Sequence, residues 1–91
     1  MRKAYLLVYS NSLGTREKVK NCLDKSNLVI HWRYDLPNAF YIISEDSANE
    51  LSDMIRGKLG NGRFIVTEIS SNKQGWLPRQ TWDLINKKKR E

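Results

Sequence analysis

The order and spacing of apolar segments constrain the fold of this 91-residue chain more than any other feature of its sequence. Four short runs rich in apolar, aromatic and β-branched residues, at 4–9, 28–35, 39–43 and 63–69, have the composition of β-strands. Amphipathic segments with helical periodicity separate the first run from the second and the third from the fourth. The residues Leu36-Pro37-Asn38 are typical of a tight turn, which makes a hairpin of the middle two runs. The pattern therefore predicts strand, helix, strand, strand, helix, strand.

Capping residues mark where the helices begin. Thr15 is the expected N-cap of the first helix, and Ser47 with Glu50 three residues later forms a capping box for the second. Gly60-Asn61-Gly62 permits the left-handed backbone that ends this second helix. A short third helix is expected with Pro78 at its first position, where proline loses no hydrogen bond.

These elements predict one α+β domain over residues 1–91 with the ferredoxin-like βαββαβ arrangement. Its four-stranded antiparallel sheet would carry two helices on one face. Residues 70–91 are expected to be a C-terminal appendix, made of a tryptophan-rich segment, a short helix and a basic tail. One cysteine, Cys22, and one histidine, His31, cannot supply a disulfide or a usual metal set, so we expect no metal and no cofactor.

A cytoplasmic location is expected from the lengths of the apolar runs. None approaches the roughly 18–20 residues that a membrane helix needs, which predicts no membrane partner. The apolar run at residues 4–9 is also too short and too aromatic for the core of a signal peptide.

Four segments of the chain carry a resemblance to a known family: in order, they are KAYLLVYS, HWRYDLPNAFYII, SANELSDMIRGKL and RFIVTEIS. In these segments the chain resembles small bacterial proteins labelled SinR-like. These differ from the helix-turn-helix repressor of similar name and are distant relatives of the second CRISPR-associated protein, a subunit of the spacer-integration complex. The resemblance covers roughly residues 3–70 and implies a ferredoxin-like fold, a homodimer and contacts to the backbone of duplex DNA.

Some members of the CRISPR-associated family are metal-dependent nucleases with an aspartate at the end of the first strand. The matching stretch here is Val8-Tyr9-Ser10-Asn11, which offers no carboxylate. A catalytic divalent cation normally needs one or two carboxylate ligands, so the resemblance does not carry the nuclease activity to this chain.

The formal net charge is +6, and Lys87-Lys88-Lys89-Arg90 supplies four of the positive charges, so the rest of the chain is only mildly basic. In the loop Ser10–Arg16, hydroxyls, an amide and an arginine precede a helix, whose first N–H groups and dipole attract anions. Ordinary turn and capping roles explain the same loop residues and are favoured over phosphate binding. For the basic tail Lys87–Arg90 a solvated helix end is likewise favoured, with a phosphate-binding appendage as the alternative. The candidate phosphate- or nucleic-acid-binding residues are Ser10, Asn11, Ser12, Arg16, Arg33, Arg63, Lys73 and Arg79.

The first and third strands are apolar or aromatic on both faces. Two helices cover only one face of a sheet, so the Trp76-to-Trp82 segment, a second copy of the chain, or both must cover the other. The expected interface residues of the resulting homodimer are Tyr5, Leu7, Tyr9, Tyr41, Ile43, Trp76 and Trp82.

Three classes of function follow. The leading hypothesis is a non-enzymatic cytoplasmic homodimer that binds DNA, RNA or nucleotide phosphates. The alternatives are a protein-interaction or toxin-antitoxin-like structural dimer, and a metal-dependent nuclease. No catalytic residue is assigned, because Ser10, His31 and Asp35 lack the motif that would support a catalytic triad.

Overall fold

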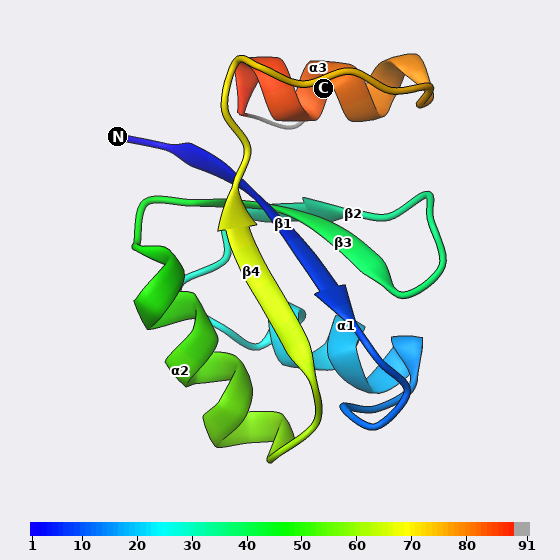
Figure 1. The fold of residues 1–91 in the computed structure, drawn as a ribbon. Helices are drawn as coiled ribbons and strands as arrows, with labels where there is room; N and C mark the ends of the chain where they lie inside the picture. Colours follow the sequence, from blue (N-terminus) through cyan, green and yellow to red (C-terminus); the bar gives the residue numbers. More distant parts are fainter. Residues whose placement is uncertain (89–91) are drawn as a thin grey trace.

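The computed structural model describes residues 1–88, which form a four-stranded antiparallel sheet and three helices (Figure 1). Along the chain the elements are β1 (Lys3–Tyr9), α1 (Arg16–Asp24), β2 (His31–Arg33), β3 (Ala39–Ser44), α2 (Ala48–Leu59), β4 (Phe64–Glu68) and α3 (Arg79–Lys87). The strand order is β2-β3-β1-β4, so β2 and β4 are the edges. The predicted α+β class and four-stranded antiparallel sheet are confirmed. Residues 89–91, with the end of the predicted basic tail, lie outside the described residues.

The main core lies between one face of the sheet and helices α1 and α2. The register pairs Tyr5 with Ile42 and Leu7 with Phe40, which places these side chains on the same face. The helices contribute buried residues at helical spacing to the same cluster: Val19, Cys22 and Leu23 from α1, and Leu51 and Ile55 from α2. Amphipathic helices of modest length therefore bury the centre of this face, whereas Trp32, Phe64 and Val66 on the edge strands are only partly buried.

Helix α3 covers part of the other face of the sheet. Leu84 and Ile85 of α3 form a second buried cluster with Ala4, Tyr41 and Ile43. Figure 1 shows α3 at the end of the sheet where β1 begins and β4 ends. The segment predicted to be an appendix thus completes a second core.

Within residues 1–88, no helix lies over the other end of this sheet face. Val8 of β1 and Ile65 of β4 are cross-strand partners on this face, and they are 42% and 61% exposed. An exposed pair of β-branched apolar side chains on a sheet is a feature that calls for an explanation.

The second strand is shorter than predicted, since β2 comprises His31–Arg33 and not residues 28–35. Leu28 lies in a turn, where its N–H donates to Ser26 Oγ (3.1 Å) and its carbonyl accepts from Ser44 Oγ (2.6 Å). Ile30, at a bend, packs with the α3 cluster, whereas Trp32 packs with the cluster beneath α1 and α2. The alternation of the predicted strand 28–35 would place Ile30 and Trp32 on one face. They lie on opposite faces instead, because regular strand alternation begins only after Ile30.

The predicted caps of α1 and α2 are confirmed. The N–H of Lys18 donates to Thr15 Oγ1 (3.2 Å), and both bonds of the capping box between Ser47 and Glu50 are present, each at 3.1 Å. Pro78 differs by one position from the prediction. It is the N-cap of α3 and not its first residue, because its ψ of 150° is extended.

Candidate functional site

The loop between β1 and α1 uses its polar groups for internal hydrogen bonds. The hydroxyls of Ser10 and Ser12 lie 2.5 Å apart, and Ser12 Oγ also accepts from the backbone N–H of Arg63 (3.1 Å). The side-chain amide of Asn38 donates to Asn11 Oδ1 (3.1 Å). These bonds favour the turn-and-cap interpretation of the loop over the phosphate-binding one.

The turn that follows α2 packs tightly against this loop. A Cβ atom added at Gly62 would lie 2.1 Å from Leu13 Cα, so only glycine permits the close approach of the two backbones. The side chain of Leu13 is itself buried in the main core. The loop is therefore fixed by packing as well as by hydrogen bonds.

Arg16 is part of an aromatic stack. Its guanidinium carbon lies 4.5 Å from the centre of the Tyr34 ring, which in turn stacks on Trp32 with ring centres 6.2 Å apart. Both rings also contact Phe40 edge-on. This cation-π contact links the start of α1 to the residues that follow β2.

Arg33 joins β2 to α3. Its Nε donates to Thr81 Oγ1 (2.6 Å), while the Thr81 hydroxyl donates to the carboxylate of Asp35. A guanidinium nitrogen of Arg33 also lies 3.7 Å from Asp35 Oδ1. Because Thr81 is completely buried, this network ties α3 to the sheet, a role that the polarity pattern of the strand did not reveal.

The remaining predicted cations are dispersed over the molecule. Lys73 donates to the carbonyl of Ser70 (3.2 Å), and Arg79 is exposed at the start of α3. Arg63 lies beside the β1–α1 loop, where its carbonyl accepts from the N–H of Ser10 (2.9 Å). The structure therefore brings together Ser10, Ser12 and Arg63 but does not gather the predicted residues into one site.

A different set of cations lines two hollows beside α2, one shared with α1 and the other with the start of β4. One open hollow of about 220 Å³, here called the lysine hollow, is lined by Lys18, Asn21, Cys22, Lys25, Lys58 and Leu59. A second hollow of about 380 Å³, the arginine hollow, is lined by Ser52, Arg56, Asn61, Gly62, Arg63 and Phe64. No carboxylate is among the lining residues, which the structure describes in full. Of the predicted phosphate-binding residues, only Arg63 is found here.

The sequence pattern did not identify four of these cations as candidates, because they lie on two helices that are far apart in the chain. Lys18 and Lys25 are two helical turns apart, a spacing that places both on one side of α1. Arg56 and Lys58 lie in the last turn of α2. The spacing on α1 is visible in the sequence, but the approach of α2 depends on how the two helices pack.

Cys22 lies at the base of the lysine hollow as a packing residue. Burial raises the pKa of its thiol, while the charge on Lys58 acts in the opposite direction. The Sγ atom lies 3.7 Å from Met54 Sδ, within the core. A buried thiol of raised pKa is a poor nucleophile.

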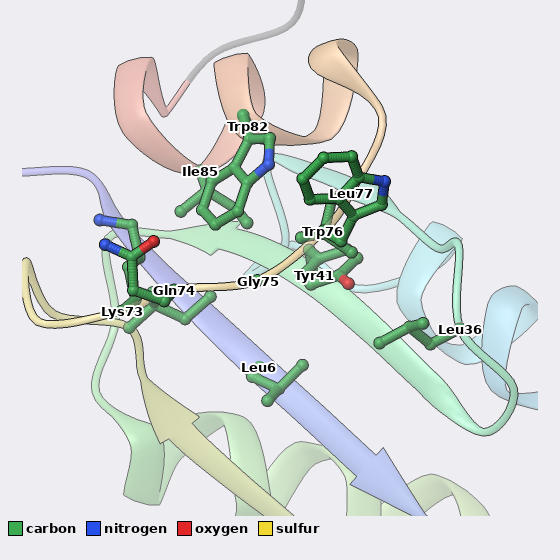
Figure 2. A pocket seen from close by; sticks show the side chains of 11 residues that line it. Leu6, Leu36, Tyr41, Lys73, Gln74, Gly75, Trp76, Leu77, Trp82 and Ile85 are labelled. Atoms are coloured by element: carbon green, nitrogen blue, oxygen red, sulfur yellow. The ribbon is translucent and has the colours of Figure 1, made fainter.

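An apolar pocket of about 370 Å³ lies on the α3 side of the sheet (Figure 2). Figure 2 shows Trp76 and Trp82 at this pocket, with Tyr41 and Leu6 on the strands beneath. Trp76 is 98% exposed. Burial, and to a lesser degree the charge of Asp35, raises the pKa of the Tyr41 hydroxyl.

The predicted interface residues fall on two different faces. Tyr41, Trp76 and Trp82 line the apolar pocket, and Ile43 lies beneath α3. Tyr5, Leu7 and Tyr9 are instead buried under α1 and α2, so their assignment to an interface is corrected. When both faces of a strand are apolar, its sequence cannot indicate which one the helices will cover.

Comparisons with protein-family models, curated proteins and solved structures find no match to this chain. Over residues 1–88, no three His, Cys, Asp or Glu side chains gather in a group that could hold a metal ion. In the same part of the chain, no helix has the length and apolar character needed to cross a membrane.

Proposed function

We propose that this chain is a non-catalytic binding module that contacts the phosphate backbone of nucleic acid through the lysine and arginine hollows. The observation that carries the proposal is the convergence of Lys18, Lys25 and Lys58 on one hollow without a lining carboxylate. Ammonium groups held near one another by folded helices repel each other, and phosphate oxygens relieve that repulsion.

The chemistry of the hollows suits backbone contacts and not the reading of bases. Lysine acts as a mobile point charge, and the exposed ends of Lys18, Lys25 and Lys58 can adapt to phosphates at different spacings. Phosphate contacts of this kind position a nucleic acid without specifying its sequence. Binding should therefore depend strongly on salt and weakly on sequence.

We also propose a ferredoxin-like fold, a distant SinR-like relationship and a cytoplasmic setting. The strand order read from the other edge, β4-β1-β3-β2, together with α1 and α2 on one face, supports a ferredoxin-like arrangement. The sequence segments quoted above support a distant SinR-like relationship, and a single cysteine with no pairing partner suits a reducing cytoplasm. The β1–α1 loop offers hydroxyl and amide oxygens but no carboxylate, which supports binding over cleavage.

Affinity for labelled duplex and single-stranded DNA and RNA, measured over a salt series, tests this proposal. Replacing Lys18 and Lys58 together by glutamine should weaken binding and lower the slope of log affinity against log salt by about 2, since each phosphate contact contributes about 0.9. The melting temperature should stay close to that of the unsubstituted protein because both side chains are exposed.

A matched control removes two positive charges from the α3 side of the molecule. Lys73→Gln with Arg79→Gln should leave affinity and salt slope nearly unchanged. Absence of binding by the unsubstituted protein at low salt would refute the proposal. A large loss of affinity in the control pair, with none in the lysine pair, would show that nucleic acid binds the α3 side and not the two hollows.

A protein-interaction module is the second candidate, and the exposed indole of Trp76 above an apolar pocket favours it. Aromatic side chains in such positions often anchor interfaces. A defined protein partner that binds the unsubstituted chain but not Trp76→Ala, in a chain that binds no nucleic acid, would favour this candidate.

A further inference from the structure

We propose that β4 is a self-pairing edge, through which two copies of this chain join their sheets into one continuous sheet. β4 is an edge strand of sequence Phe-Ile-Val-Thr-Glu, which contains neither proline nor lysine. Natural proteins usually protect exposed edges with such residues, because an unprotected edge is a template for another strand. This proposal is independent of nucleic-acid binding.

The hydrogen bonds between β1 and β4 identify the groups at the free edge. The N–H of Ser10 donates to the carbonyl of Arg63 (2.9 Å), and the N–H of Ile69 donates to the carbonyl of Ala4 (2.8 Å). Odd-numbered residues of β4 therefore direct their backbone groups toward β1. Because these directions alternate along a strand, the N–H and carbonyl groups of residues 64, 66 and 68 point away from the sheet.

One antiparallel register uses all of these outward groups. A two-fold axis perpendicular to the sheet at Val66 places Val66 opposite its own copy and Phe64 opposite Glu68 of the second copy. Each outward residue is then in a hydrogen-bonded pair, and α1 and α2 of both copies lie on the same face. Such an interface is isologous and closed, so pairing stops at two copies.

Charge complementarity supports this register. Phe64 lines the arginine hollow together with Arg56. Glu68 of the second copy, opposite Phe64, would therefore place its exposed carboxylate beside Arg56, and the symmetry repeats this contact at the other end. The register also keeps the two Glu68 carboxylates apart, since each faces Phe64. Opposite charges at the rim of an interface favour one register over others.

The same register covers an exposed apolar side chain on the other face. Ile65, which is 61% exposed, would lie opposite Thr67 and diagonal to Ile69 of the second copy. Ile69 lines the apolar pocket below Trp76, so the apolar surfaces of the two copies would be continuous. This arrangement explains why Ile65 has no cover within a single chain.

Val66→Pro tests the inference directly. The substitution removes an outward N–H and no bond to β1, a position where edge strands tolerate proline. By light scattering at micromolar concentration, the unsubstituted protein should have about twice its 10.7 kDa chain mass, and Val66→Pro should have the single mass. Val66→Thr, which keeps the N–H and the branched shape, is the matched control and should remain a dimer. Circular dichroism checks that each variant is folded.

A charge exchange tests the register even if the proline variant does not fold. Glu68→Arg should weaken the dimer by placing a cation beside Arg56, and adding Arg56→Glu should restore it. A monomeric unsubstituted protein overturns the inference, as does a dimer that survives both Val66→Pro and Glu68→Arg. Failure of the double exchange to restore the dimer overturns the register centred on Val66.

Discussion

Single residues in this chain have roles that depend on partners far away in the sequence. Arg33, Asp35 and Thr81 form one network, although almost fifty residues separate the strand from the helix. Arg33 was expected to contact phosphate, but α3 supplies a buried hydroxyl that engages both Arg33 and Asp35. Polar side chains paired in this way stabilise a specific docking position.

Thr81→Val tests this network at the residue scale. Valine keeps the shape of threonine but leaves Arg33 Nε and the Asp35 carboxylate each without one partner. We expect the free energy of unfolding to fall by about 1–3 kcal/mol, because the two lost hydrogen bonds involve charged, half-buried groups. Urea denaturation measures the change, with removal of an exposed hydroxyl, Ser70→Ala, as the control. A loss as small as that of the control would mean that the network contributes little.

At the scale of elements, α2 has the best-defined start in the chain. The carboxylate of Glu50 accepts from the backbone N–H of Ser47 and from its hydroxyl, and these two bonds lower the pKa of Glu50. A carboxyl group whose pKa is lower in the folded state stabilises the fold above its unfolded pKa of about 4.3. That contribution is lost as the pH falls through the folded pKa.

The capping box therefore predicts a pH-dependent difference between the unsubstituted protein and Glu50→Gln. The variant should melt at a lower temperature near neutral pH, and the gap should close as the pH falls below about 4.3, where the native carboxyl also becomes neutral. Thermal melts from neutral to acidic pH measure this gap. A gap of constant size over the whole range would show that the charge of Glu50 plays no part.

At the scale of the whole molecule, the sheet separates two cores. Helices α1 and α2 cover the centre of one face, while α3 covers part of the other. Leu84 and Ile85 of α3 pack on β1 and β3, whose alternate residues belong to the main core, so we expect the terminal helix to unfold together with the sheet.

Leu84→Ala tests this cooperativity. Removing a buried leucine side chain should lower the free energy of unfolding by about 2–5 kcal/mol. If α3 belongs to the same cooperative unit, unfolding followed by far-UV circular dichroism and by tryptophan fluorescence should show one coincident transition. A separate early transition that leaves the sheet intact would show that α3 unfolds independently, as an appendix to the domain.

The sequence by itself determined the order of the elements, the α+β class and the caps of α1 and α2. Each of these depends on residues close together in the chain. The spacing of Val19, Cys22 and Leu23 defines a helix face, and Ser47 and Glu50 satisfy backbone donors within one turn. Such local hydrogen bonds and periodicities involve only neighbouring residues, so the amino-acid sequence alone predicts them.

Tertiary structure alone decided which face each helix covers, where Arg33 finds its partners and which lysines converge. The apolar residues of β1 alternate on both faces, so the sequence pattern is the same whether Tyr5 or Leu6 faces α1 and α2. Likewise, Lys18 and Lys58 meet only because two helices distant in sequence pack side by side. These features depend on how separate surfaces fit together, which no local pattern contains.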